Sequence, residues 1–154
     1  IVGDGEDKKA LEVLCNELNL TFNAEGIEDP LIYFTSWRKD MDAVYAGLDL
    51  VALTSKNEGT PVTLIEAQAS NKPIVTTDVG GVRDVVMPDV TAYVSDKNDS
   101  TKFATNMSLL LNNDSERLRM GSAGYNHVSE LFSYKRLVKD VSELYENLLN
   151  EKNI

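Results

Sequence analysis

Two glutamate side chains, Glu58 and Glu66, flank the start of a short predicted helix in this 154-residue sequence. The helix follows the apolar run Leu50–Leu53, which is typical of a strand buried on both faces, and a polar loop that carries Gly59. Free amides at a helix start, together with the helix macrodipole, favour an anion such as a phosphate. Carboxylates accept hydrogen bonds from hydroxyl groups. The arrangement therefore predicts a site for a ligand that carries both phosphate and hydroxyl groups.

The start of this helix is predicted from Thr60 and Pro61. Thr60 suits the N-cap, and Pro61 suits the first helical position because its missing N–H has no intrahelical partner there. Glu66 lies about 8 Å further along the axis and shares a helical stripe with Val62 and Ile65, which we expect to face the core. Because a buried carboxylate needs hydrogen-bond donors, a ribose diol would suit Glu66. Pairing with a nearby Arg or Lys, or exposure to solvent, is the alternative for an isolated glutamate.

The string NEGTPVTLIEA, followed by KPIVTTDVGG, resembles the signature of the retaining GT-B glycosyltransferases. The spacing of Glu58 and Glu66 matches the paired-glutamate motif of that family. The resemblance implies that Glu58 is the catalytic residue that contacts the transferred sugar, and that Glu66 binds the ribose of the nucleotide. It also implies that the segment between the glutamates contacts the donor sugar and its phosphates. The donor-binding residues expected in that segment are Gly59, Thr60, Pro61 and Val62.

A second glycine-containing loop follows the predicted strand Ile74–Thr76. Adjacent Gly80 and Gly81 lie beyond the carboxyl end of that strand, which is where open α/β sheets bind ligands. Glycine allows close approach of the backbone to a ligand, and the resemblance places this loop near the donor sugar or the acceptor. A plain tight turn is the alternative.

Trp37 and Arg38 lie in a loop after the predicted strand Leu31–Phe34, also beyond a carboxyl end. Trp37 can pack beside a nucleotide base, and Arg38 can add positive charge for an anionic donor. The alternative is that Trp37 covers the edge of the core and that Arg38 is solvated. The family often has Gly at the position of Ser36, so the path of this loop is open.

Strands are predicted near residues 1, 31, 50, 73 and 91, and they alternate with helices. This order predicts an α/β fold with a Rossmann-like parallel sheet flanked by helices, which the resemblance identifies as one half of a GT-B fold. Asn71 is expected to end the central helix in a left-handed conformation. The other helices are expected at 7–18, 41–46, 101–111, 115–129 and 132–149.

Length and composition limit the possible classes of protein. Residues 1–154 are long enough for a single nucleotide-sugar-binding domain with a core of its own. The net charge of −10 argues against a nucleic-acid surface. The single cysteine, Cys15, suits a reducing compartment and is expected to be buried, and with one histidine, His127, no zinc-type site is expected. No apolar run approaches the roughly 20 residues of a membrane span.

The glycine-containing start IVGDG resembles the second strand of the family's nucleotide-binding domain. We therefore expect the domain to be truncated at its N-terminal strand, so that the strand and loop that usually supply an Arg and a Lys to the diphosphate are absent. The acceptor-binding domain of the family is also expected to be absent. The last predicted helix commonly packs on that domain, so part of its apolar face is expected to be exposed.

The expected function is that of the donor-binding domain of a glycosyltransferase. Its parent would transfer a sugar with retention from a UDP- or GDP-linked donor to a hydroxyl acceptor in glycan or polysaccharide biosynthesis, without a metal or other cofactor. The expected partners are the nucleotide-sugar and the N-terminal acceptor-binding domain of the same parent, which is expected in the cytoplasm. The resemblance allows peripheral membrane association of the parent through that domain. The isolated chain is expected to bind nucleotide weakly and to transfer no sugar.

Two alternatives have different predicted signatures. A nucleotide-sugar 2-epimerase-like isomerase or hydrolase shares the GT-B fold, but its pattern of glutamate and arginine differs from the one found here. A flavodoxin-like or response-regulator binding module would need a flavin loop or an aspartate pocket, and neither is recognisable. Product analysis with a donor alone separates a transferase from an epimerase.

Overall fold

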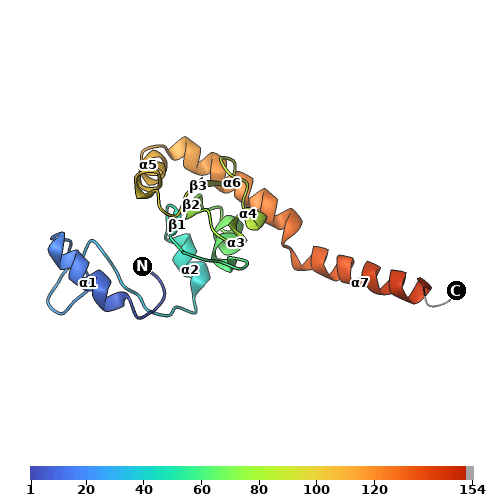
Figure 1. The fold of residues 1–154 in the computed structure, drawn as a ribbon, viewed down its shortest axis with the longest axis horizontal. Helices are drawn as coiled ribbons and strands as arrows, with labels where there is room; N and C mark the ends of the chain where they lie inside the picture. The colour runs from blue at the N-terminus through green and yellow to red at the C-terminus, as the bar shows by residue number, and fades with distance from the viewer. Residues whose placement is uncertain (152–154) are drawn as a thin grey trace. The chain divides into compact units, whose positions relative to one another are not determined.

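A computed structural model describes residues 1–151 of the chain (Figure 1). The chain forms two compact units, Ile1–Ala43 and Val44–Ile154, called here the first unit and the second unit. Residues 41–46 form the short helix α2 (Met41–Ala46), which contains the boundary between the units. Within residues 1–151, no helix combines the length and the apolar content that crossing a membrane requires.

The second unit is built on a parallel sheet of three strands in the order β1-β2-β3 (Figure 1). The strands are β1 (Val51–Leu53), β2 (Ile74–Thr77) and β3 (Ala92–Ser95). The α/β class and the parallel sheet predicted from the sequence are thus confirmed. Every residue of β2 is buried, as expected for a central strand, whereas Ala52 of β1 is exposed. The prediction that this strand is buried on both faces is wrong, because β1 lies at the edge of the sheet.

Helices of the second unit pack on this sheet and on one another. Helix α3 contacts β1 and β2, α5 contacts β2 and β3, and α6 contacts both α3 and α5. The buried side chains of Val75, Leu110 and Met120, from β2, α5 and α6, form one apolar cluster. The helices are α3 (Val62–Ala69), α4 (Val82–Val85), α5 (Ser100–Leu111), α6 (Asp114–Leu131) and α7 (Tyr134–Glu151).

Helix α7 buries none of its side chains. Leu137, Leu144 and Tyr145 on its apolar stripe are 64%, 57% and 64% exposed. The prediction of an exposed apolar face on the last helix is therefore confirmed.

One helix earlier, the half-buried ring of His127 packs edge-on against Phe132, in agreement with a packing role for this histidine.

The first unit contains α1 (Lys8–Glu17), which buries the Cys15 side chain as predicted. The two strands predicted near residues 1 and 31 lie side by side, since the Ile1 amine donates to the Tyr33 carbonyl at 2.6 Å and the Thr35 amide donates to the Ile1 carbonyl at 3.0 Å. Neither forms a continuous strand. The amide of Phe34 donates to the Asn23 side chain at 2.7 Å instead of to a neighbouring strand, which interrupts the hydrogen-bond ladder.

Two residues that are not glycine adopt the left-handed backbone conformation at points that the sequence had singled out. Asn71, at the end of α3, has φ of 55°, which confirms the predicted left-handed helix end. Ser36 also has φ of 55°, and the family often has Gly there. The loop before Trp37 therefore follows the path that a glycine would favour, although the residue is serine.

Glu116 links α6 to β3 and stabilises the second unit in a pH-dependent way. Its carboxylate accepts hydrogen bonds from Arg119 at 2.7 Å and from the Tyr93 hydroxyl at 2.8 Å. These donors, Arg119 first, lower the pKa of Glu116 from 4.5 to about 2. A carboxyl group whose pKa is lower in the folded protein stabilises the fold above its unfolded pKa, and this contribution is lost as the pH falls through the folded pKa.

We predict that Glu116→Gln lowers the free energy of unfolding by about 1–2 kcal/mol at pH 7, because the side chain is partly exposed and its hydrogen bonds are charge-assisted. The difference from the parent chain should shrink between about pH 4.5 and pH 2. Urea unfolding at several pH values measures this difference. Glu130→Gln, at an exposed position on the same helix, is the control and should change little. A difference that stays constant with pH would contradict the prediction.

Candidate functional site

Helix α3 begins at Val62, one residue later than the sequence predicted. Pro61 occupies the N-cap with φ of −72° and ψ of 91°, an extended conformation outside the α region. The prediction of Thr60 as the N-cap is therefore wrong, because Pro61 completes the loop and does not start the helix. The Leu64 amide donates to the Pro61 carbonyl at 3.0 Å. Proline carries no side-chain acceptor, so it cannot cap the Val62 and Thr63 amides of the first turn. Those amides remain suited to an external anion.

The loops that carry Glu58 and Gly81 pack against each other at the carboxyl ends of β1 and β2. The Gly81 amide donates to the Glu58 carbonyl at 3.2 Å. A Cβ atom on Gly81 would lie 2.0 Å from the Gly59 carbonyl oxygen, and one on Gly80 would lie 1.8 Å from the Glu58 carbonyl oxygen. Gly80 also has φ of 49°, a left-handed conformation that favours glycine. Gly80 and Gly81 thus allow close approach of the Glu58–Gly59 backbone. The sequence analysis had predicted that a ligand approaches these two glycines.

The half-buried Glu58 side chain is held by the residues that follow β1. The Ser55 hydroxyl donates to Glu58 Oε1 at 2.6 Å. The Ser55 carbonyl in turn accepts a hydrogen bond from the Thr77 hydroxyl, at the end of β2, at 2.7 Å. The end of the central strand therefore positions the Glu58 carboxylate through Ser55.

Glu66 lies on the exposed face of α3 together with Val62, and Ile65 of the same predicted stripe is half-buried. The prediction that this stripe faces the core is wrong. The core-facing residues are Leu64, Ala67 and Gln68, each fully buried. The predicted helical period is correct, but the predicted buried face is not. The prediction did not allow for Gln68, a polar residue that is buried in the core. Its amide nitrogen donates to the Leu64 and Val85 carbonyls. The Glu66 carboxylate is consequently open to a ligand, one helical turn from Val62.

Tyr45 of α2 reaches Glu66 from the neighbouring helix. The Tyr45 hydroxyl lies 3.0 Å from Glu66 Oε2 and 3.3 Å from the Thr63 carbonyl oxygen, and the side chain is only 3% exposed. Burial and the adjacent Glu66 carboxylate raise the pKa of Tyr45 above its ordinary value. The sequence reasoning did not identify Tyr45. Its spacing of four residues from Met41 is a weak sign of burial, but its partner lies 21 residues away.

A positive side chain lies close to the glycine loop but is neutralised locally. The guanidinium of Arg83, in α4, donates to both carboxylate oxygens of Asp78, with contacts of 2.6 to 3.0 Å. This hydrogen-bonded pair lowers the pKa of Asp78 and raises the pKa of Arg83. Both side chains are partly exposed, so the pair contributes little to stability. The Arg83–Asp78 pair links the loop that holds Gly80 and Gly81 to α4.

Trp37 and Arg38 belong to the first unit. Trp37 is 80% exposed, so the alternative that it covers the edge of a core is wrong. Arg38 forms an ion pair with Asp40, and the hydrogen bond from Arg38 lowers the pKa of that carboxyl. Their donor-binding roles stay predictions.

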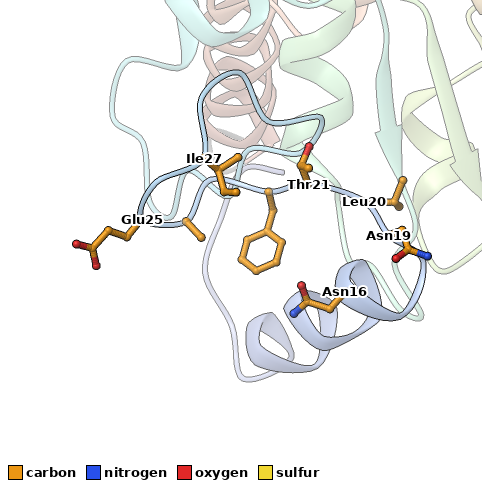
Figure 2. A pocket seen from close by; sticks show the side chains of 8 residues that line it. Asn16, Asn19, Leu20, Thr21, Glu25 and Ile27 are labelled. Carbon is orange, nitrogen blue, oxygen red and sulfur yellow. The ribbon is translucent and has the colours of Figure 1, made fainter.

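A cavity of about 420 Å³ lies within the first unit (Figure 2). It is lined by side chains of α1 and of the segment after it, among them Asn16, Asn19 and Glu25. None of the predicted site residues lines this cavity.

Comparison with known proteins identifies the class to which this fold belongs. The chain resembles sucrose-phosphate synthase from Thermosynechococcus elongatus, with a TM-score of 0.79 and 21% identity over 97% of the chain and 38% of the synthase. It resembles the HepE protein of Anabaena, solved in complex with UDP, with a TM-score of 0.81 and 22% identity over 95% of the chain and 40% of HepE. The fold is therefore the Rossmann-like half of a GT-B fold.

Sequence comparison gives the family. Residues 1–127 match the family profile described as glycosyl transferases group 1. The D-inositol 3-phosphate glycosyltransferase of Corynebacterium kroppenstedtii is 30% identical over 125 residues, which make up 80% of this chain and 28% of that protein. The chain belongs to the glycosyl transferases group 1 family. It spans less than a third of the length of that relative.

Proposed function

We propose that the chain is the donor-binding domain of a glycosyltransferase that transfers a sugar with retention from a UDP- or GDP-linked donor to a hydroxyl acceptor. The observation that carries the proposal is the packing of the Glu58–Gly59 loop on Gly80 and Gly81, directly before the helix that carries the exposed carboxylate of Glu66. The Glu58 loop and the start of α3 thereby lie at the carboxyl ends of parallel strands, and Glu66 follows in the second turn of that helix. The relative HepE, solved with UDP and with UDP-glucose, supports a nucleotide-sugar as the ligand.

Each group at this site suits one part of such a donor. The diphosphate would lie at the uncapped amides of the first turn of α3, where the helix macrodipole stabilises negative charge. This charge grows as the bond to the sugar breaks, so the amides would stabilise the leaving diphosphate more strongly in the transition state. Glu58 would accept hydrogen bonds from hydroxyl groups of the transferred sugar, and Glu66 from the ribose diol.

Other parts of the proposal concern the parent protein. The acceptor would bind to a separate N-terminal domain of the same parent, and that domain would supply acceptor specificity in glycan or polysaccharide biosynthesis. We expect no metal at the donor site, and we expect the parent to act in the cytoplasm. Trp37 and Arg38 stay predicted donor-binding residues, for the base and the anionic groups respectively.

Removing the Glu66 carboxylate tests the ribose role. We predict that Glu66→Ala weakens binding of UDP or GDP, whichever binds the parent chain more tightly, by roughly tenfold to a hundredfold, because two hydrogen bonds to a charged acceptor are lost. Glu66 is exposed and the Tyr45 hydroxyl keeps the Thr63 carbonyl as an acceptor, so folding should be little affected. Titration followed by NMR measures both affinities even when they are weak.

Glu130→Ala, at an exposed position on α6, is the matched control for a change in net charge. It should leave nucleotide affinity unchanged. Equal affinities for Glu66→Ala and the parent chain would contradict the ribose role, and the absence of UDP and GDP binding to the parent chain would contradict the proposed function itself.

A further inference from the structure

The Tyr45 hydroxyl is a buried donor with two acceptors within reach. It lies 3.0 Å from Glu66 Oε2 and 3.3 Å from the Thr63 carbonyl oxygen, and a phenol has one proton to donate. The carboxylate is the nearer and the charged acceptor, and hydrogen bonds to charged acceptors are the stronger ones. The proton of Tyr45 therefore lies toward Glu66.

This hydrogen bond fixes one oxygen of Glu66 and leaves the other for a ligand. Among residues 1–151, no donor is hydrogen-bonded to Glu66 Oε1. A glutamate side chain at an exposed helix position samples several rotamers, and ordering it has an entropic cost. The Tyr45 ring is almost fully buried, so its hydroxyl is a fixed point against which the carboxylate is held.

We propose that Tyr45 is a positioning residue for donor recognition, which orients the Glu66 carboxylate so that it accepts the ribose hydroxyls of a nucleoside diphosphate. This inference rests on the proposed function, because it assigns a partner to the glutamate that binds the ribose there. Preorganisation by Tyr45 strengthens binding by removing part of the ordering cost from the binding step. Burial and the hydrogen bond to Glu66 raise the pKa of Tyr45, so its hydroxyl keeps its proton at neutral pH.

A ligand pair separates this role from simple packing of the ring. UDP and 2′,3′-dideoxy-UDP differ only in the ribose hydroxyls, so the ratio of their dissociation constants measures the hydroxyl contribution. We expect the parent chain to prefer UDP by about tenfold or more. Tyr45→Phe keeps the ring and removes the hydroxyl, and we expect it to lower this ratio about threefold by weakening UDP binding alone. If GDP binds better than UDP, the guanosine pair replaces the uridine pair.

The second unit offers a matched control for Tyr45→Phe. The Tyr93 hydroxyl donates to Glu116 at 2.8 Å, in a tyrosine–glutamate pair formed by β3 and α6. Tyr93→Phe therefore removes a hydrogen bond of the same kind and should leave the ratio unchanged. Thermal unfolding of each variant gives the stability lost with each hydroxyl, so that losses in binding are compared between folded proteins.

The possible outcomes distinguish this inference from the proposed function. A lower ratio for Tyr45→Phe, with the Tyr93→Phe ratio unchanged, supports the positioning role. An equal weakening of both ligands by Tyr45→Phe, or no weakening, overturns it. If the parent chain binds the two ligands equally, the ribose role of Glu66 fails first and the positioning role fails with it. If Glu66→Ala lowers the ratio and Tyr45→Phe does not, only the positioning role fails.

Discussion

Gly81→Ala is expected to separate the two loops of the candidate site and to destabilise the second unit by about 2–4 kcal/mol. The backbone of Gly81, with φ of −81° and ψ of 16°, is one that alanine adopts readily. The cost therefore comes from space alone, because the new Cβ atom would lie 2.0 Å from the Gly59 carbonyl oxygen. A backbone carbonyl cannot rotate away as a long side chain would. Urea unfolding measures the loss in stability.

Nucleotide binding should be affected together with stability. If the Gly59 segment moves away from the new methyl group, the backbone amides of this segment and the Glu58 carboxylate are displaced relative to the start of α3. We expect UDP affinity to fall by more than tenfold in Gly81→Ala under conditions in which the variant is folded. Titration followed by NMR provides both the affinity and a check of the fold.

Gly59→Ala is the matched control on the other side of the same contact. A Cβ atom on Gly59 meets no atom within 4 Å, so this variant should unfold within about 0.5 kcal/mol of the parent chain. Similar stability for Gly81→Ala and Gly59→Ala would show that the loops do not pack as described. A stable Gly59→Ala variant with impaired nucleotide binding would place that methyl group against the ligand.

Local sequence signals predicted the helices and the central strands well. Asn71 before Lys72-Pro73 predicted a left-handed helix end, and the backbone at Asn71 has that conformation. Such features are decided within a few residues by the backbone preferences of asparagine and proline. The parallel order of the strands also followed from their alternation with helices.

Features that depend on distant residues were not predictable in the same way. The predicted buried face of α3 was wrong because Gln68 is buried between Leu64 and Val85. The Val85 carbonyl, which accepts a hydrogen bond from Gln68, belongs to α4. The strand expected at 31–34 is interrupted because Asn23 captures the Phe34 amide. The contact between Glu58 and Gly80 could not be predicted from the sequence. A pair of adjacent glycines allows close approach equally of a ligand and of another loop, and the sequence does not distinguish the two.

Helical periodicity predicted that Glu66 faces the core, and the structure places it on the exposed face of α3. The ligand role that the family motif gives to Glu66 stays a prediction, because exposure to solvent was also the alternative to that role. Tyr45 escaped both kinds of reasoning. A buried tyrosine hydroxyl needs a hydrogen-bond partner, but only the fold brings Glu66 within 3.0 Å.

Gly121→Ala in α6 has two opposing effects on the free energy of unfolding, a gain in helix propensity and a loss in packing. The larger of the two decides whether the variant is more or less stable. Alanine in a helix interior is favoured over glycine by about 1 kcal/mol. Against this gain, a Cβ atom on Gly121 would lie 2.2 Å from the Asn71 carbonyl oxygen. The turn at Asn71 resists displacement, since the Asn71 amide donates to the Gln68 carbonyl at 3.0 Å and the Lys72 amide to the Ala67 carbonyl at 2.9 Å. The clash should therefore exceed the gain.

We expect Gly121→Ala to lower the free energy of unfolding by about 2–4 kcal/mol, because α6 must move away from α3 and open the contact between these helices. Ser122→Ala, at the next and exposed position, changes helix propensity without a packing clash. It should therefore be neutral or slightly stabilising. Urea unfolding of both variants beside the parent chain measures the difference. An increase of about 1 kcal/mol for Gly121→Ala would mean that propensity alone governs this position, so that α6 does not rest on the end of α3. Because α3 carries Glu66 on its opposite, exposed face, that result would also remove the support on which the orientation of the candidate site depends.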